Sequence, residues 1–383
     1  MVGMGTVKEV LSEVNASNDS LATIYIHVPF CNKICSFCNM RRSLQKPASN
    51  YADLIVEEIK KYAKLQYVNS TTFDAVYFGG GTPTTLSSEE LCKILQALKS
   101  NFRFTLDAEF TIETTVTELT EEKMQVLIAN GVNRFSVGVQ TFDDKGREQM
   151  GRIGDGKKAY ERLKQLKNYP NVTVSMDLIY NYPGQTMDSL MRDLELIEEL
   201  DLDGFSMYSL INMKETTIDS AQGEKNDEKM FFEISNIMKE KGYEFLELTK
   251  MVKKDQYRYI MNRHKGADTL PLGAGAGGQV NGLAIMNPIN LSEYEESIVG
   301  FNDRKGMLFA PEYVEVVRFK GDVQTVFLPR NESMYKDVEE YIKFRDELMQ
   351  SGMVIPTKDG YRLTEKGIFW GNTISRELSE RIH

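Results

Sequence analysis

Three cysteines lie close together in the segment Tyr25 to Met40, which reads YIHVPFCNKICSFCNM. Cys31, Cys35 and Cys38 have the spacing C-x-x-x-C-x-x-C, and thiolates are soft ligands that suit iron–sulfur clusters and zinc. Three thiolates can hold three irons of a 4Fe–4S cube and leave the fourth iron without a protein ligand. An open position on a metal is where a substrate or cofactor binds. The spacing therefore predicts a reactive cluster, with these three cysteines as metal ligands and catalytic residues.

Other uses of the cysteines fit the pattern less well. A structural zinc site closes with a fourth Cys or His. The nearby His27 lies on an expected strand, and the alternation of that strand directs the His27 side chain into the packed interior. Cysteines that only fill a core occur singly, and disulfides suit small secreted domains. Cys92, the fourth cysteine, lies on the apolar side of a helical pattern, and we interpret it as a core residue. Zinc stays open as the alternative to the cluster.

The composition narrows the class of protein. A chain of 383 residues is too long for one ordinary domain, so we expect a large and a small one. Its 46 basic and 56 acidic residues give a net charge of −10, which argues against a nucleic-acid partner. Clustered cysteines fit a reducing cytosol. Because no uncharged apolar run approaches the length of a membrane span, we expect a cytoplasmic protein with no membrane partner.

Strand and helix patterns alternate along the first two thirds of the chain. Strands are expected at Ile24–Val28, Phe73–Phe78, Asp107–Ile112, Arg134–Val139, Thr173–Tyr180 and Gly204–Leu210. Helices are expected between them at Asn50–Gln66, Ser88–Asn101, Glu121–Asn130, Gly156–Lys167 and Met187–Leu200. Six such units imply a parallel sheet with helices packed outside it. Because chemistry collects at the carboxyl ends of the strands in barrel-like α/β folds, and the polar motifs follow those ends, we expect one shared site.

The cysteine loop resembles the cluster loop of radical S-adenosylmethionine (SAM) enzymes, in the HemN-like branch related to oxygen-independent coproporphyrinogen III oxidase. The match continues in order through YFGGGTPT at 77–84, RFSVGVQTF at 134–142 and DLIYNYPGQT at 177–186. The resemblance implies an α/β fold in which a partial (β/α)6 radical SAM barrel replaces a closed eight-stranded one. We place this barrel at residues 23–225, after an N-terminal extension at 1–22.

The pattern changes beyond residue 225. Residues 226–300 are expected to extend the barrel on the substrate side, and residues 301–383 to form a small C-terminal HemN-like cap. A helix at 334–351, two short strands flanking residues 358–360 and a terminal helix capped by Thr364 predict a winged-helix-like α+β domain. Since the chain is acidic, we interpret this domain as a structural lid and not as a DNA-binding unit.

The resemblance also implies that two SAM molecules share the cavity. A run of glycines at Gly79–Gly81 lets backbone approach a ligand closely. The residues that match contacts of the cluster-bound SAM are Tyr25, Gly80 and Glu113. Those that match contacts of the second SAM are Phe37, Gly81, Thr82, Gln140, Arg152, Asp177 and Ile211. Gln140 is also expected to serve catalysis. Because a carboxylate in an apolar strand is costly unless paired, Asp177 is either a ligand contact or the salt-bridge partner of Arg152.

The substrate has to be inferred from the C-terminal half, because several chemistries share the core motifs. The segment LPLGAGAGG at 270–278 corresponds to a loop in which heme-trafficking relatives read GAH, and Gly277 replaces that His. Together with GIFWGN near the C-terminus, it is similar to the anaerobic heme-utilisation branch, the anaerobilin synthases. Met40 departs from the residues that many relatives have after the cluster. The candidate substrate contacts are Tyr257, Tyr259 and His264, with a solvent-facing position equally open for His264.

The implied activity is radical opening of the heme ring. The reduced cluster cleaves one SAM to a 5′-deoxyadenosyl radical, which takes hydrogen from the methyl group of the second SAM. The resulting carbon radical adds to a meso carbon of heme, which yields a linear tetrapyrrole and frees iron. A flavodoxin-like or other low-potential protein would donate the electron. The alternatives are a heme chaperone, a coproporphyrinogen III oxidase, a methyltransferase or cyclopropanase on another substrate, and a zinc-stabilised winged-helix regulator.

Overall fold

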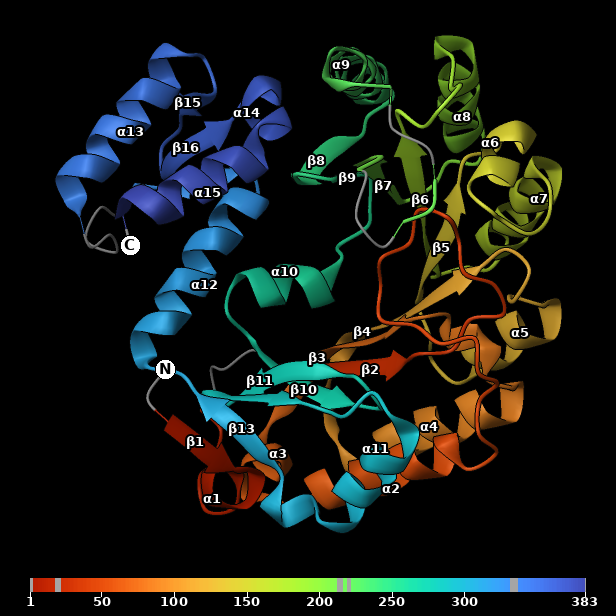
Figure 1. Cartoon of the computed structure of the whole chain (residues 1–383), viewed down its shortest axis with the longest axis vertical. Helices are drawn as coiled ribbons and strands as arrows, with labels where there is room; N and C mark the ends of the chain where they lie inside the picture. Colours follow the sequence, from red (N-terminus) through yellow and green to blue (C-terminus); the bar gives the residue numbers. More distant parts are fainter. Residues whose placement is uncertain (1–2, 18–21, 212–215, 219–221, 331–336, 383) are drawn as a thin grey trace.

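A computed structural model describes residues 3–17, 22–211, 216–218, 222–330 and 337–382. The strands of its main sheet are β1 (Gly3–Thr6), β2 (Ala22–Val28), β3 (Thr72–Gly80), β4 (Arg103–Thr115), β5 (Arg134–Gln140), β6 (Thr173–Tyr180), β7 (Gly204–Ser209), β8 (Glu244–Glu247), β9 (Lys250–Val252), β10 (Asp268–Leu272), β11 (Gly277–Val280), β12 (Leu283–Met286) and β13 (Lys305–Leu308). Their order in the sheet is β1-β13-β12-β11-β10-β2-β3-β4-β5-β6-β7-β9-β8. The sheet curves around the short helix α10 (Arg258–His264) (Figure 1).

The six predicted strands run parallel from β2 to β7 in the expected order, which confirms the α/β barrel. The structure adds a seventh parallel strand, because β10 lies beside β2 with Pro271 opposite Tyr25. The sequence pattern did not reveal β10, since proline and the glycines that follow weaken a strand signal. The strands β11 to β13 then extend this edge as antiparallel neighbours.

Helices cover the outer face of the sheet (Figure 1). They are α1 (Val7–Leu11), α2 (Tyr51–Tyr62), α3 (Gln66–Ser70), α4 (Ser88–Asn101), α5 (Glu121–Ala129), α6 (Asp144–Gln149), α7 (Gly156–Lys167), α8 (Met187–Glu199), α9 (Glu224–Glu240) and α11 (Leu291–Val299), while α10 (Arg258–His264) lies on the inner side. Short 3-10 turns occur at Pro83–Thr85 and Phe301–Asp303. The predicted helix at 50–66 was wrong at its end, because it stops at Tyr62 and a separate α3 follows.

Local capping explains where some of these helices begin. At α4 the Ser87 hydroxyl accepts from the Glu90 N–H at 3.2 Å, and the Glu90 carboxylate accepts from the Ser87 N–H at 2.8 Å. This reciprocal capping box satisfies two backbone donors that a helix start leaves open. Gly131 follows the end of α5 with φ +90°, the left-handed geometry that favours glycine after a helix. The sequence predicted both of these boundaries.

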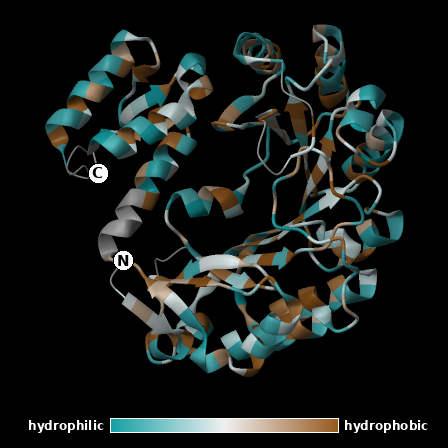
Figure 2. Ribbon diagram, in the orientation of Figure 1, coloured by the Kyte–Doolittle hydropathy of each residue, from teal (hydrophilic) through white to brown (hydrophobic). Residues whose placement is uncertain are grey.

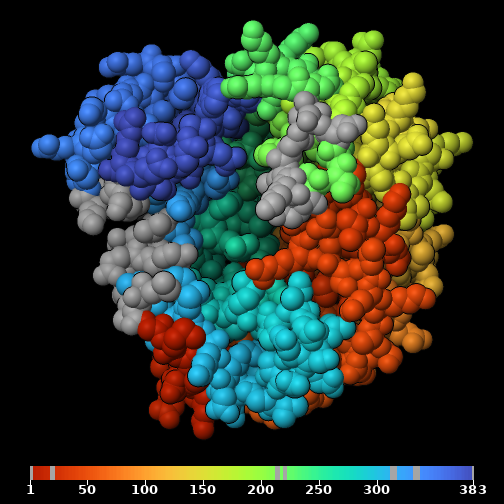
Figure 3. Space-filling view, viewed as in Figure 1, coloured from red at the N-terminus to blue at the C-terminus, as the bar shows by residue number. Residues whose placement is uncertain are grey.

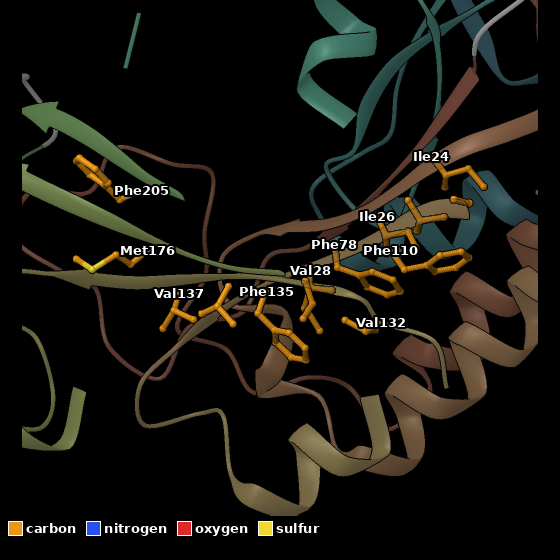
Figure 4. Close-up of a cluster of buried hydrophobic side chains, with 14 of the residues drawn as sticks. Ile24, Ile26, Val28, Phe78, Phe110, Val132, Phe135, Val137, Met176 and Phe205 are labelled. Atoms are coloured by element: carbon orange, nitrogen blue, oxygen red, sulfur yellow. The ribbon is translucent and has the colours of Figure 1, made fainter. Parts of the chain in front are cut away.

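The hydrophobic core lies between the sheet and the outer helices (Figures 2 and 4). Alternation along β2 sends Ile24, Ile26 and Val28, all 0% exposed, into this core. Tyr25 and His27 therefore point to the other face of the sheet, toward the inside of the barrel. Figure 4 labels further members of the core from neighbouring elements: Phe78, Phe110, Val132, Phe135, Val137, Met176 and Phe205.

The C-terminal unit contains a three-stranded sheet and several helices (Figure 1). Its elements are α12 (Pro311–Gln324), β14 (Phe327–Pro329), α13 (Val338–Gln350), β15 (Val354–Pro356), β16 (Gly360–Leu363), α14 (Glu365–Phe369) and α15 (Gly371–Ile382). The predicted single terminal helix is two helices, which meet at Trp370. The segment that carries β13 lies in the range predicted for the cap, yet it pairs with β1 and β12 in the main sheet. The division at residue 301 stays a prediction.

The described part of the chain holds no helix that combines the length and apolar character needed to span a bilayer.

Candidate active site

The cysteine loop is fixed at its base and at its middle. At the base, the Cys31 N–H donates to the Ser43 carbonyl at 2.9 Å, and the Ser43 N–H donates to the Pro29 carbonyl at 2.7 Å. In the middle, the Ser36 hydroxyl donates to the Gln149 carbonyl at the end of α6, at 2.8 Å. These bonds hold the loop against the carboxyl ends of the barrel strands.

The three loop cysteines are free, half-buried thiols that line one cavity. Cys31 Sγ lies 3.7 Å from the Thr82 hydroxyl, and Cys35 Sγ accepts from Arg152 Nη1 at 3.2 Å. Burial raises the pKa of Cys31, and the nearby Cys38 and Cys35 raise it further. A cation beside the Cys31 thiol favours its ionised form, and the irons of a cluster would supply such a charge. The donor set therefore fits an iron–sulfur cluster.

A single zinc ion fits this part of the molecule less well. Among the described residues, no three His, Cys, Asp or Glu side chains form a group that could hold one metal ion, whereas the thiolates of a cube bind separate irons. His27 does not complete a zinc set, because both of its ring nitrogens have hydrogen-bond partners. Its Nε2 donates to the Arg41 carbonyl at 3.3 Å, so Nδ1 accepts from the Tyr25 hydroxyl at 2.9 Å.

The cavity, of about 480 Å³, lies at the carboxyl ends of the central strands and is called the radical cavity below. It brings together, with the three thiols, all but one of the predicted cofactor contacts: Phe37, Gly80, Gly81, Thr82, Glu113, Gln140, Arg152, Asp177 and Ile211. Met40, the residue that departs from the family pattern, also lines it. Tyr25 is the predicted contact outside this lining. Residues from five strands, from the cysteine loop and from the loop that carries Arg152 thus face a common space.

Glu113 lies at the end of β4 inside this cavity and not on the outer surface. Its carboxylate accepts from the Tyr77 hydroxyl at 2.6 Å and from the Gly80 N–H at 3.2 Å. Burial raises the pKa of Glu113 to about 7, against these two hydrogen bonds. Only glycine fits at position 80, because its φ is +111° and a Cβ would come within 2.5 Å of the His27 ring. The glycine run thus presents an N–H group directly to the carboxylate.

Gln140 and Arg152 are positioned by a residue that the sequence did not single out. Gln140 ends β5 at a bulge with φ +77°, a strained geometry for a side chain other than glycine. Arg147 is 1% exposed and its guanidinium lies between the two segments. It donates at 2.8–3.1 Å to four backbone carbonyls, those of Val139, Thr141, Ile153 and Gly154. Two of these carbonyls flank Gln140 and two follow Arg152, so Arg147 joins both cavity segments.

Arg152 and Asp177 do not form the ion pair that was one of the predicted alternatives. The Arg152 guanidinium contacts Cys35 and the Gly138 carbonyl, and among the described side chains it forms no ion pair with Asp177. Asp177 lines the cavity, where burial raises its pKa and the positive charge of Lys250 opposes that rise. The other alternative, a ligand contact, stays a prediction for Asp177.

A network of buried charges lies beneath Asp177. Asp255 accepts from the Arg134 guanidinium through both oxygens at 2.8 Å, and Lys250 Nζ lies 3.2 Å from Asp255 Oδ2. Lys250 also donates to the Ser175 hydroxyl at 2.6 Å. Burial alone would raise the pKa of Asp255, but the charges of Arg134 and Lys250 hold it well below its usual range. These residues fix β5, β6 and β9 to one another under the cavity.

The three predicted substrate contacts are not brought together. Tyr259 is 3% exposed and stacks on Tyr77 and Tyr25, with ring centroids 4.6 and 5.9 Å apart. Tyr257 is 8% exposed and lies against the buried network, with the Arg134 guanidinium 4.5 Å from its ring. His264 lies at the end of α10 and lines a separate cavity. The substrate role of all three residues stays a prediction.

Comparison with known proteins decides the family. Residues 25–197, which contain the cysteine loop and the radical cavity up to Asp177, match the model of the radical SAM superfamily. The chain is 28% identical to anaerobilin synthase of Escherichia coli O157:H7, over 98% of this chain and 87% of that protein. This chain therefore carries a radical SAM domain.

Two further relatives have names that give other activities. This chain is 26% identical to the heme chaperone HemW of Lactococcus lactis, over 91% of this chain and 95% of that protein. Its structure also resembles that of coproporphyrinogen III oxidase (HemN) from Escherichia coli, with a TM-score of 0.81 and 20% identity, over 99% and 96% of the two chains. At that identity the structural match establishes the fold alone. The radical SAM core is therefore common to relatives whose names give different activities.

Proposed function

We propose that this protein opens the porphyrin ring of heme by radical chemistry. In this proposal one SAM is the source of the radical and a second SAM donates a methylene or methyl carbon, which gives a linear tetrapyrrole and frees iron. The observation that carries the proposal is the radical cavity, in which three thiols face Gly80, Glu113 and Arg152 across one space. Full-length similarity to anaerobilin synthase supports the choice of substrate.

The chain's own residues would divide the work of binding in the radical cavity. Cys31, Cys35 and Cys38 would hold the 4Fe–4S cluster, which supplies the single electron that initiates the radical chemistry. The carboxylate of Glu113, which already accepts from the Gly80 N–H, would accept from the amino group of the first SAM. Since carboxylates bind cations best when ionised, this contact favours a pH above the raised pKa of Glu113.

The second SAM would contact the opposite side of the cavity. Gln140, Arg152 and Asp177 supply an amide, a cation and a carboxylate there, and Thr82 supplies a hydroxyl. The Arg147 guanidinium and the buried network beneath Asp177 limit the movement of these groups. A fixed wall excludes water and orients reactants, which a reactive carbon radical requires.

The test is anaerobic turnover of the reconstituted protein with a low-potential reductant, SAM and heme, with the products identified by mass. We expect 5′-deoxyadenosine, S-adenosylhomocysteine and a linear tetrapyrrole in parallel with released iron. A flavodoxin should replace the chemical reductant. Intact heme beside released 5′-deoxyadenosine would overturn ring opening and leave radical SAM chemistry in place.

A heme chaperone is the second candidate, favoured by the full-length similarity to HemW. A chaperone would return intact heme to an acceptor protein and would not consume SAM in proportion to heme. Turnover with coproporphyrinogen III in place of heme tests the oxidase alternative, which predicts loss of carbon dioxide from propionate groups. A methylated or cyclopropanated product from a different acceptor would favour the remaining alternative.

A further inference from the structure

A second cavity, of about 680 Å³, lies outside the radical cavity. Its lining comes from the inner helix α10, from the antiparallel edge β10 to β13 and from α12. Figure 3 shows the molecule hollowed in this region, with teal α10 at the bottom between the cyan strands and the blue C-terminal unit. Its size is within the range of small-molecule sites. His264 is the predicted substrate contact that lines it.

One wall of this cavity is flat and weakly polar. Strand pairing places Met307 opposite Ala284, Ala284 opposite Gln279 and Gln279 opposite Thr269, so these side chains share one face of the sheet. Ala284 and Thr269 are the small members of this row, and Gln279 lies between them. Met286 and Met307 lie at the sides of this face, and their side chains are 56% and 42% exposed. Thioether side chains are flexible and polarisable, and they adapt to large apolar ligands.

The facing wall carries positive charge without a compensating acid. Arg263 on α10 and Lys320 on α12 both line the cavity, whereas the lining residues that the structure describes include no Asp or Glu. His264 is different, because its Nε2 lies 3.1 Å from the Glu247 carboxylate. In a chain with a net charge of −10, two such cations over an apolar face predict an anionic ligand.

The second cavity also contacts the cysteine loop. Arg41, which follows the loop, donates from Nη1 to Met286 Sδ at 3.2 Å. On the other side, α10 carries Tyr259 toward the aromatic stack beside the radical cavity and carries Arg263 into the second cavity. The helix that lines the second cavity therefore reaches the radical cavity through Tyr259 and Tyr77, whose hydroxyl donates to Glu113.

We propose that the second cavity binds a flat apolar ligand with carboxylate side groups, the chemical class of a porphyrin dicarboxylate. The macrocycle would lie on the face formed by Thr269, Ala284 and the two methionines, with its carboxylates on Arg263 and Lys320. This inference rests on the proposed function for the identity of the ligand. It assigns the ligand to residues outside the radical SAM match at 25–197.

The test is a titration of the cluster-loaded full chain, without SAM, with protoporphyrin IX, its dimethyl ester and heme, followed by porphyrin absorbance. The double variant Arg263→Glu with Lys320→Glu reverses both charges and should lower the affinity for protoporphyrin IX at least tenfold. Its affinity for the dimethyl ester should stay within twofold of wild type, because the ester has no carboxylates. The matched control is Lys358→Glu with Arg376→Glu, two exposed cations of the C-terminal unit, and it should bind like wild type.

A second variant tests the cavity and not its charge. Ala284→Phe places a ring on the flat face. It should lower the affinities for protoporphyrin IX and for its dimethyl ester alike, at least tenfold. Protoporphyrin IX affinities within twofold of wild type in both variants would overturn the proposal. Affinity for heme alone would also overturn it, because recognition would then depend on the iron.

The outcome separates this inference from the proposed function. If wild type binds protoporphyrin IX as expected but returns heme intact in turnover, ring opening fails and the binding site stands. If the two variants bind and open heme like wild type, the binding site fails and ring opening stands.

Discussion

The radical cavity and the second cavity are built in different ways. The radical cavity is formed at the ends of parallel strands, and its polar residues include Thr82 and Gln140, each 6% exposed. Backbone and buried-charge contacts hold those segments, most clearly at Arg147 and Asp255. The second cavity is formed by antiparallel strands and helices, and long exposed side chains contribute to its walls.

This difference matches two tasks. Radical chemistry needs groups held within a fraction of an ångström, which buried hydrogen bonds and strained backbone provide. A site for a large apolar ligand gains from side chains that can repack, such as Met286 and Met307. We therefore expect substitutions around the radical cavity to affect chemistry and stability, and substitutions around the second cavity to affect ligand affinity.

The largest effect is expected at the thiols of the radical cavity. Replacing Cys31, Cys35 and Cys38 with Ala together should abolish bound iron and SAM cleavage, since no ligands for a cluster remain in the loop. The matched control is Cys92→Ala. Cys92 is half-buried on α4, where its sulfur accepts from Gln96 at 3.1 Å, so our interpretation of it as a core residue was wrong. Iron content after anaerobic reconstitution is the measurement, and iron retained by the triple variant would refute the cluster.

A large loss of stability is expected in the buried network. Asp255→Asn would leave Arg134 and Lys250 buried without their common carboxylate, which costs about 3–5 kcal/mol. Asp53→Asn is the control, because Asp53 pairs with Lys93 at the surface with side chains about half exposed, and such pairs contribute less than about 1 kcal/mol. Denaturant unfolding of both variants measures the difference. Equal losses would show that the network does not support the radical cavity.

A smaller effect, on SAM binding, is expected at Arg147. Arg147→Leu removes the donor that joins four carbonyls around Gln140 and Arg152, so both side chains should shift. Because a misplacement of about 1 Å can cost roughly 100-fold in rate, we expect the KM for SAM to rise about 10- to 100-fold. Lys145→Leu, an exposed position on the same helix, is the control. Unfolding curves would show whether the loss follows from stability alone, and an unchanged KM would remove Arg147 as a positioning residue.

Much of the barrel could be predicted because its signals are local. The boundaries predicted for Ser88–Asn101, Gly156–Lys167 and Thr173–Tyr180 are those of α4, α7 and β6. Each segment has apolar residues at the spacing typical of its secondary structure, and the two helices also have a capping residue at the start. The cavity lining could be predicted for a different reason: parallel strands present their carboxyl ends at one edge, so motifs that follow strands must meet.

The missed features depend on contacts between distant parts of the chain. β1 pairs with β13, about 300 residues later, and nothing in GMGT indicates that partner. Arg147 lies in the charged stretch DDKGREQ, which is typical of an exposed helix, whereas its guanidinium is held inside by carbonyls of two other segments. The second cavity needs α10, β12 and α12 together, so no single segment predicts it.

The smallest effect predicted is the pH dependence of SAM binding at the radical cavity. The pKa of Glu113 is raised to about 7, so the carboxylate that should bind the SAM amino group is mostly protonated at pH 6 and mostly ionised at pH 8. If only the ionised form binds, the Kd for SAM should rise at most about tenfold as the pH falls from 8 to 6. The effect on folding has the opposite sign, because a raised carboxyl pKa stabilises the fold below 4.5 and loses that contribution as the pH rises through 7.

Equilibrium binding of SAM at several pH values measures this dependence, and Glu113→Gln should make it flat. Asp193 is the necessary control, because burial raises its pKa to about 7 as well and it accepts from Thr141 and Phe142 next to Gln140. If Asp193→Asn removes the pH dependence while Glu113→Gln keeps it, the titrating group acts by positioning the β5 end.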